Sequence, residues 1–319
     1  MHPKILCGDA LSVLKTLPDQ SVNCCITSPP YFGLRNYGID GQIGLESTID
    51  QYVQKLVDVF HEVHRVLRDD GTLWVNLGDS YNAGRNGGHP GGKKQWKPEQ
   101  KKYQERSGAN VEGLKPKDLI GVPWRVAFAL QKDGWILRQD IIWHKPGPMP
   151  ESCQDRCTRS HEYLFLLAKN NKYYYDAEAI KEKAKYGEHH AKYQGTYHRH
   201  KIESMQKDGA TNGEAYQCGL QNPAKNPLKR NKRSVWTVQT ASYDGAHFAV
   251  FPPALIEPCV LAGCPVDGVV LDPFAGSGTT GMVAKQQGRN SVLIELNPQY
   301  VKLIEERCAE VQSGNLFTV

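Results

Sequence analysis

Five consecutive residues near the N-terminus, Thr27-Ser28-Pro29-Pro30-Tyr31, are suited to binding an amino group on an aromatic ring. They follow an apolar run at 22–26 that predicts a strand, and ligands of open α/β sheets bind beyond strand ends. The prolines fix the backbone and lack N–H donors, so the Ser28 hydroxyl and the Pro29 carbonyl can accept the two amino hydrogens. Tyr31 offers a ring on which a planar base can stack. The alternative interpretation is a rigid turn with a surface tyrosine.

A second segment, residues 269–280, combines a strand, a glycine loop and a helix start, VVLDPFAGSGTT. Gly276 and Gly278 let the backbone approach a ligand and turn into the helix. Glu295 ends another predicted strand 19 residues beyond Gly276, where an acidic side chain can accept hydrogen bonds from ribose hydroxyls. Because the loop lacks GxGxxG spacing, it favours an adenosyl ligand without phosphates, with Asp272 serving its charged amino-acid portion. A GxG pattern alone more often marks a structural turn.

The two segments can act together only if the strands that precede them end at the same edge of one sheet. Apolar residues at helical spacing predict helices at 48–68, 118–132, 253–262, 279–287 and 298–311. Apolar, β-rich runs predict strands at 22–26, 72–77, 135–143, 163–168, 268–271 and 291–295. Strands that alternate with helices predict a doubly wound, mostly parallel α/β sheet.

The chain of 319 residues carries a net charge of only +5, but the charge is unevenly distributed. Residues 84–118 hold nine Lys and Arg against four Asp and Glu, and residues 181–233 hold twelve against five. The second segment also interleaves amides and cations with Tyr and His rings, which suits the edges and faces of nucleic-acid bases. The two basic segments indicate a polyanionic partner, although solvated surface loops would have the same composition.

Composition also limits the class of protein. Apolar residues make up 39% of the chain, and no run approaches the 18 apolar residues of a membrane span. With no apolar run at the N-terminus, we expect a soluble, cytoplasmic protein. The nine cysteines form no CxxC pair, so no metal site is predicted.

The motifs TSPPY at 27–31 and DPFAGSGTT at 272–280 resemble those of the amino-group DNA methyltransferases, which use S-adenosylmethionine. The catalytic motif precedes the cofactor motif, as in the circularly permuted beta class of that family. Three further segments are similar to family motifs, namely Gly8-Asp9 near the cofactor adenine, HFAVFPP at 247–253 on the methionine side, and IIWHKP at 141–146 facing the target base.

The resemblance implies a circularly permuted methyltransferase sheet of Rossmann-like type. Residues 1–183 and 234–319 would form the catalytic domain, in which 84–117 is a flexible basic loop. Residues 184–233 would form an inserted target-recognition region.

Transferred motif by motif, the resemblance implies three sets of site residues. The implied catalytic residues are Ser28, Pro29, Pro30 and Tyr31. Cofactor binding falls to Asp9, Thr27, His247, Phe248, Phe251, Pro252, Asp272, Phe274, Gly276, Ser277, Gly278, Thr279, Glu295 and Asn297. Contacts to the target base or DNA fall to Trp143, Lys145, Lys229, Arg230, Lys232 and Arg233.

The implied activity is site-specific transfer of a methyl group from S-adenosylmethionine to the exocyclic amine of a flipped base in double-stranded DNA. A serine at the head of the tetrapeptide, here Ser28, favours cytosine N4 in this family, whereas adenine N6 presents the same two hydrogens and stays open. Methyl transfer to RNA or to protein glutamine is a more remote alternative, because such enzymes usually carry an asparagine-led tetrapeptide after the cofactor motif. The resemblance also suggests a homodimer and a cognate restriction endonuclease as partner.

Overall fold

The computed structural model describes residues 3–34, 38–82, 111–184, 229–240 and 251–311. The chain divides into two compact units. Met1–Tyr175 and Ser234–Val319 form the larger unit, and Asp176–Arg233 form the smaller one.

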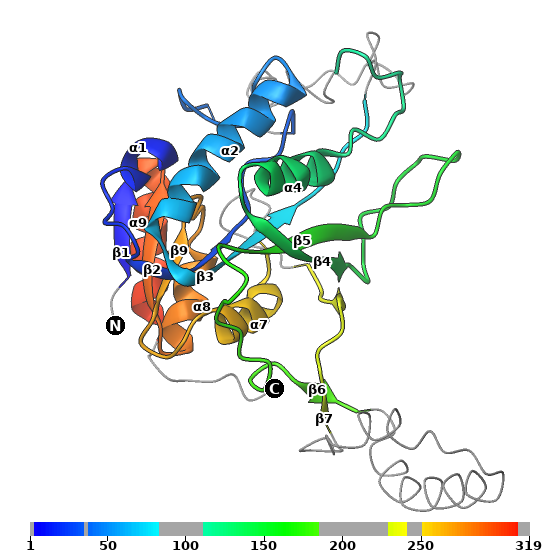
Figure 1. Cartoon of the computed structure of the whole chain (residues 1–319). Helices are drawn as coiled ribbons and strands as arrows, with labels where there is room; N and C mark the ends of the chain where they lie inside the picture. Colours follow the sequence, from blue (N-terminus) through cyan, green and yellow to red (C-terminus); the bar gives the residue numbers. More distant parts are fainter. Residues whose placement is uncertain (1–2, 35–37, 83–110, 185–228, 241–250, 312–319) are drawn as a thin grey trace, which may run out of the picture. The chain divides into compact units, whose positions relative to one another are not determined.

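The larger unit is built on one eight-stranded sheet with the strand order β1-β10-β9-β2-β3-β5-β4-β8 (Figure 1). Every neighbouring pair is parallel except the two that β5 makes, with β3 and with β4. The prediction of a mostly parallel α/β sheet is therefore confirmed. In chain order the strands are β1 (Lys4–Cys7), β2 (Val22–Thr27), β3 (Leu67–Leu77), β4 (Ile136–His144), β5 (His161–Ala168), β8 (Val235–Thr237), β9 (Val269–Asp272) and β10 (Asn290–Glu295).

Among the described strands, the last two in chain order, β9 and β10, lie inside the sheet and not at its edge. β10 pairs with β1, and β9 pairs with β2, where Cys25 lies opposite Leu271. Strands β1 and β2 are therefore neighbours in sequence but are separated in the sheet by the C-terminal strands. This insertion is the circular permutation that the motif order predicts.

Helices cover the two faces of the sheet in two groups (Figure 1). Helices α1, α2 and α4 pack together, as do α7, α8 and α9. Their bounds are α1 (Ala10–Leu14), α2 (Ile49–Val66), α4 (Val122–Lys132), α7 (Pro253–Gly263), α8 (Thr279–Gln286) and α9 (Pro298–Glu310). In the described ranges no helix is long and apolar enough to cross a membrane.

The sequence pattern explains the longest helix and misses the shortest elements. Thr48 caps α2 by accepting a hydrogen bond from the Gln51 backbone N–H at 3.2 Å, and the buried residues that follow recur every three or four positions. Strand β3 begins at Leu67, directly after the helix, and not at Thr72 as predicted. Strands β1 and β8 and helix α1 are three to five residues long, too short for a periodic signal.

The smaller unit contains a short antiparallel pair, β6 (Glu182–Lys183) with β7 (Lys229–Arg230). Glu182 Oε1 accepts hydrogen bonds from Arg230 Nε at 2.8 Å and from Arg233 Nε at 2.6 Å. Residues 185–228 lie outside the described part of the chain.

Candidate active site

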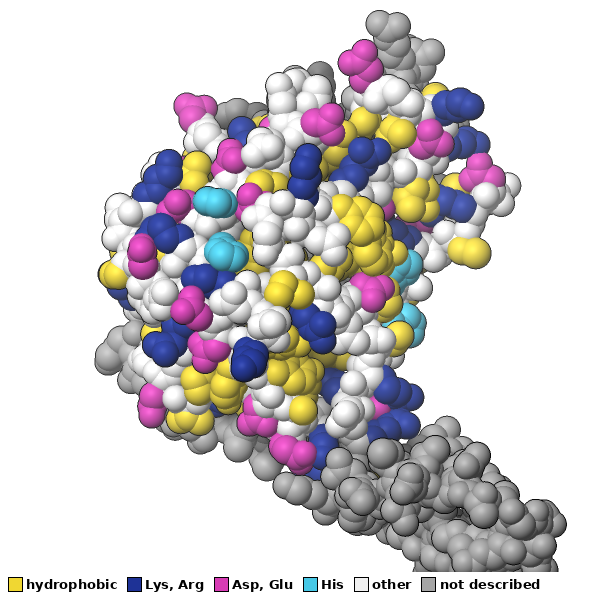
Figure 2. All heavy atoms as spheres, in the orientation of Figure 1, with side chains coloured by type: hydrophobic (Ala, Val, Ile, Leu, Met, Phe, Trp, Pro, Cys, Tyr) yellow, Lys and Arg dark blue, Asp and Glu magenta, His cyan; other side chains and the backbone are white. Residues whose placement is uncertain are grey.

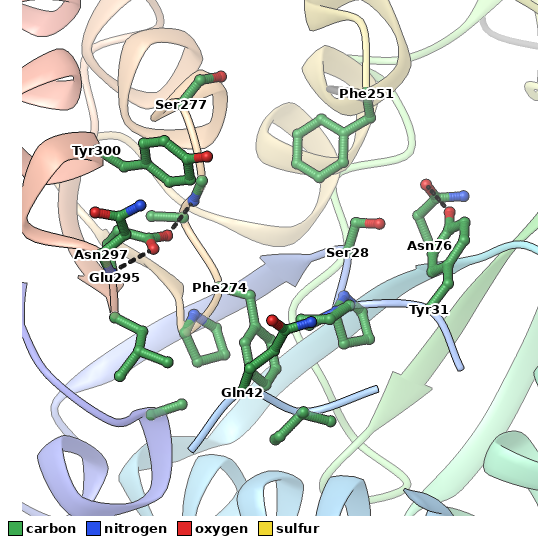
Figure 3. A pocket seen from close by; sticks show the side chains of 18 of the residues that line it. Ser28, Tyr31, Gln42, Asn76, Phe251, Phe274, Ser277, Glu295, Asn297 and Tyr300 are labelled. Atoms are coloured by element: carbon green, nitrogen blue, oxygen red, sulfur yellow. Dashed lines mark hydrogen bonds between the residues drawn. The ribbon is translucent and has the colours of Figure 1, made fainter. Parts of the chain in front are cut away.

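A cavity of about 280 Å³ lies at the carboxyl-terminal edge of the parallel strands. Much of its lining comes from residues that directly follow β1, β2, β9 and β10, and the ends of β3, β4 and β5 contribute Asn76, Trp143 and Glu162. Figure 3 shows Glu295, Asn297 and Tyr300 gathered at one end and Ser28, Tyr31 and Asn76 at the other. The two motifs identified in the sequence therefore meet in one cavity, where open α/β sheets bind their ligands.

The first motif forms one wall of the cavity. Ser28, Pro29, Pro30 and Tyr31 all line it, directly beyond the end of β2. The Tyr52 hydroxyl, on helix α2, donates a hydrogen bond to the Pro30 carbonyl at 2.9 Å. Two fixed proline φ angles and this bond make the turn rigid.

Tyr31 is held at its hydroxyl and along its ring. The hydroxyl donates to Glu162 Oε2 at 2.8 Å and lies 3.3 Å from Asn76 Oδ1. The ring packs so closely on Gly78 that a Cβ there would lie 2.6 Å from Tyr31 Cε2. Burial, followed by the charge of Glu162, raises the pKa of Tyr31 well above its ordinary value, although the Ser28 hydroxyl opposes the shift. The phenol therefore keeps its proton and acts as a hydrogen-bond donor.

The glycine loop and Glu295 form the opposite end. Glu295 Oε2 accepts a hydrogen bond from the Gly276 N–H, and Oε1 accepts one from the Asn297 N–H, both at 2.8 Å. Burial raises the pKa of Glu295, while these two N–H groups oppose that shift. Each carboxylate oxygen retains a second lone pair, so Glu295 can still accept a hydrogen bond from a ligand hydroxyl.

The start of helix α8 adds a polar atom that lacks a protein partner. Thr279 lines the cavity and is 2% exposed, and its Oγ1 has no hydrogen-bond partner among the described residues. Buried polar atoms normally find a partner, and N–H groups at a helix start attract anions. This corner of the cavity therefore suits a carboxylate.

Asp272 has a structural role that the sequence did not indicate. Its carboxylate accepts the hydroxyls of Thr27 and Thr280, each at 2.6 Å, and the Phe274 N–H at 3.0 Å. The side chain is 1% exposed and is not part of the cavity lining, so the structure does not place it against the charged portion of a ligand. It instead joins β2 to the glycine loop.

The other predicted cofactor residues divide into three groups. Asp9, Phe251, Phe274, Gly276, Ser277, Thr279, Glu295 and Asn297 line the cavity. Thr27, Pro252 and Gly278 do not, and a Cβ on Gly278 would lie 2.8 Å from Ile304, so this glycine permits close packing of helix α9. His247 and Phe248 lie outside the described residues.

Of the predicted DNA contacts, only Trp143 and Lys145 line the cavity. Lys145 Nζ lies 4.2 Å from the centre of the Trp143 ring and forms an ion pair with Glu162. Lys229, Arg230, Lys232 and Arg233 belong to the smaller unit. On the face of the larger unit seen in Figure 2, Lys and Arg are interspersed with Asp and Glu, so the described residues there form no continuous basic patch.

Sequence reasoning missed several polar residues of the cavity, among them Asn76 and Glu162. Asn76 lies near the carboxyl end of β3, and Glu162 lies at the amino end of the antiparallel strand β5, which reaches the same edge. A polar residue at the end of an otherwise apolar strand is the signal that could have found both.

Solved structures similar to this chain include a DNA methyltransferase and a SAM complex. The cytosine-N4-specific PvuII DNA methyltransferase superimposes with a TM-score of 0.62 at 18% identity, over 99% of this chain and 88% of that chain. The SAM complex of M1.HpyAVI superimposes with a TM-score of 0.54 at 17% identity, over 96% of this chain and 98% of that one. At these identities the likeness shows the fold, which is that of an α/β methyltransferase.

Comparison with known sequences identifies the protein family to which the chain belongs. Type II methyltransferase M.Cfr9I of Citrobacter freundii is 50% identical over 304 residues, 94% of this chain and 85% of that protein. Type II methyltransferase M.SmaI of Serratia marcescens is 47% identical over 310 residues, 95% and 90% of the two chains. The sequence profile of the N6/N4 DNA methylase family matches residues 22–306. The chain belongs to the N6/N4 DNA methylase family.

Proposed function

We propose that this protein is a site-specific DNA methyltransferase that transfers the methyl group of S-adenosyl-L-methionine to cytosine N4. The observation that carries the proposal is the meeting of the Ser28–Tyr31 turn and the Gly276–Thr279 loop in one cavity. One end suits an adenosyl ligand and the other suits a planar base with an amino group, which are the two reactants of this transfer.

The residues of the cavity fit the cofactor. Glu295 would accept the ribose hydroxyls, and Thr279 with the start of helix α8 would hold the methionine carboxylate. Asp9, at the end of β1, would lie near the adenine. The bound cofactor supplies an electrophilic methyl group on a sulfonium, a reagent that no amino-acid side chain provides. M1.HpyAVI, which has the same fold and was solved as a SAM complex, supports this choice.

The target nucleotide must leave the duplex to reach Ser28, at a cost of roughly a few kcal/mol. The lone pair of the target amino nitrogen is conjugated into the base ring and is therefore a weak nucleophile. Hydrogen bonds from the amino group to the Ser28 hydroxyl and the Pro29 carbonyl favour a tetrahedral nitrogen, whose lone pair is no longer conjugated. A bond forms from nitrogen to the methyl carbon, the carbon–sulfur bond breaks with its electrons on sulfur, and one N–H proton passes to water. Because nitrogen becomes positive as the bond forms, the two acceptors stabilise the transition state most.

Two features favour cytosine as the target base. Ser28 heads the tetrapeptide, and in the family that the sequence resembles a leading serine favours cytosine N4. The Lys145 ammonium on the cavity wall can only donate hydrogen bonds. Along the Watson–Crick edge cytosine carries two acceptors, N3 and O2, whereas adenine carries N1 alone on that edge and N7 on the other side of its amine. A donor that faces the Watson–Crick edge of the base would therefore suit cytosine better.

The partners follow from the same proposal. Residues 184–233 would read double-stranded DNA, with Lys229, Arg230, Lys232 and Arg233 neutralising phosphates. The Type II methyltransferases among the relatives support a restriction endonuclease of the same sequence specificity as a cognate partner, in a bacterial cytoplasm. A homodimer would match a palindromic site.

The deciding experiment is mass spectrometry of nucleosides from unmethylated double-stranded DNA incubated with the protein and isotopically labelled S-adenosyl-L-methionine. Label in N4-methylcytosine is the expected result. Label in N6-methyladenine would retain the mechanism and overturn the choice of base. If DNA carries no label while RNA or protein does, the proposed substrate is wrong.

A further inference from the structure

Glu162 lies where three strands bring their ends into the cavity. It is the second residue of β5, opposite Trp143 on β4, and the next residue, Tyr163, lies opposite Leu77 on β3. Because β5 runs antiparallel to both neighbours, its first residues reach the edge where the parallel strands end. The Glu162 side chain is 16% exposed and lines the cavity.

The two carboxylate oxygens of Glu162 contact two walls of the cavity, at the end that is proposed to hold the target base. Oε1 forms the ion pair with Lys145 Nζ, and that ammonium lies over the Trp143 ring. Oε2 accepts the Tyr31 hydroxyl at 2.8 Å and the Asn76 Nδ2–H at 3.2 Å. One side chain therefore contacts the cation of one wall and the aromatic ring of the other.

We propose that Glu162 is a positioning residue that fixes the Tyr31 ring and the Lys145 ammonium relative to each other, and so sets the orientation of the target base. The inference rests on the proposed function, because the base end of the cavity is assigned there. Glu162 acts through Tyr31 and Lys145 and does not touch the reacting atoms.

The chemistry of the contacts explains why a carboxylate is needed. Both of its oxygens must accept, one from an ammonium and one from a phenol, and an amide has only one acceptor oxygen. Without Glu162, Lys145 would be a mostly buried cation without its counter-charge, and the Tyr31 hydroxyl would lose its shorter hydrogen bond. Displacement of reacting groups by about 1 Å can cost on the order of 100-fold in rate.

The variants separate the two contacts. Glu162→Ala removes both, Tyr31→Phe removes only the hydroxyl, and Glu162→Gln keeps an acceptor for Tyr31 but loses the charge that pairs with Lys145. The double variant Glu162→Ala/Tyr31→Phe tests whether the two residues act together. Asp70→Asn is the matched control, because its exposed carboxylate pairs with Arg68 at the amino-terminal end of β3, away from the cavity.

The measurements are kcat and KM on a plasmid that the wild-type enzyme methylates, and the Kd of S-adenosyl-L-methionine. We expect Glu162→Ala to lower kcat about 10- to 100-fold and Tyr31→Phe to lower it by less, as expected for impaired positioning. The double variant should be within about 2-fold of Glu162→Ala, and Glu162→Gln should mainly raise KM for DNA. The cofactor Kd should change by less than about 2-fold. Wild-type kcat in Glu162→Ala, or additive effects in the double variant, would overturn the inference.

The failure of the proposed function would be visible separately, as wild-type protein that methylates no DNA. In that case the same variants are compared by their unfolding temperatures. Shifts that are non-additive between Glu162→Ala and Tyr31→Phe support the linkage of the two walls. Additive shifts overturn it.

Discussion

The Thr27 hydroxyl donates a hydrogen bond to the Asp272 carboxylate at 2.6 Å, across 245 positions of the chain. Thr27 is the last residue of β2 before the Ser28 turn, and Asp272 is the last residue of β9 before the glycine loop. Thr280 on helix α8 donates to the other carboxylate oxygen. One buried carboxylate therefore fixes the Ser28–Tyr31 turn relative to the Gly276–Thr279 loop.

Asp272→Asn should change how stability depends on pH. Burial raises the pKa of Asp272 from 3.8 to about 6. Because the folded state then holds the proton more tightly than the unfolded state, the contribution of Asp272 is greatest below about pH 4 and is lost as pH rises to about 6. Two pKa units correspond to roughly 3 kcal/mol. Relative to wild type, the neutral Asn variant should therefore gain up to about 3 kcal/mol between pH 4 and pH 7 in urea unfolding, and parallel curves would contradict this.

Ser28→Ala should depress turnover without weakening the binding of the cofactor. The hydroxyl is proposed to accept a hydrogen bond that strengthens in the transition state, so kcat should fall by about 10- to 100-fold while the Kd of S-adenosyl-L-methionine stays within about 2-fold. The exposed Ser21, whose hydroxyl donates to the Pro18 carbonyl, provides the control Ser21→Ala. Equal activity of the two variants would exclude a catalytic role for Ser28.

Gly78→Ala should act on Tyr31 alone among the residues proposed to be catalytic. The new Cβ would lie 2.6 Å from Tyr31 Cε2, a distance that side-chain packing does not permit, so the ring must move. We expect at least about a 10-fold loss of kcat/KM for DNA, because the target base is proposed to stack on the displaced ring. Binding of the cofactor, measured by calorimetry, should be unchanged, and a proportional loss of both would indicate general damage to the fold.

Lys229→Ala should reduce the salt dependence of DNA binding. Lys229 is exposed in the smaller unit, and removal of one phosphate contact lowers the slope of log K against log salt by roughly 1. The control is Arg68→Ala, which removes an exposed cation from the amino-terminal edge of the sheet. Identical slopes for Lys229→Ala and wild type, from fluorescence anisotropy at several salt concentrations, would exclude a phosphate contact.

Sequence rules identified many residues of the cavity but not the hydrogen bonds between the elements that hold them. Ser28, Gly276 and Glu295 could be placed because each follows or ends a predicted parallel strand, and such ends share one edge. The bond from Thr27 to Asp272 could not be predicted, because it depends on β9 pairing with β2. From its place before the glycine loop, Asp272 was expected to serve the charged portion of a ligand, whereas in the structure it accepts two hydroxyls and one backbone N–H.

Glu162 shows the other limit of sequence reasoning. Its strand was predicted from the apolar run at 163–168, and the pattern gave no direction for that strand. Only the antiparallel pairing of β5 with β3 and β4 brings the amino end of the run to the cavity. Periodicity shows that a strand exists, whereas direction comes from tertiary pairing.

The placement of β9 and β10 between β1 and β2 sets the order in which the protein can form during synthesis. When β1 and β2 leave the ribosome, their sheet neighbours β10 and β9 have not yet been translated. Translation adds about 5–20 residues per second, so the edges of β1 and β2 that later pair with β10 and β9 stay unpaired for roughly 10 seconds or more. Unpaired edges invite association with other chains. A ribosome that stops before residue 269 would release a chain that has the Ser28 turn but lacks Asp272, to which Thr27 bonds, and lacks the glycine loop.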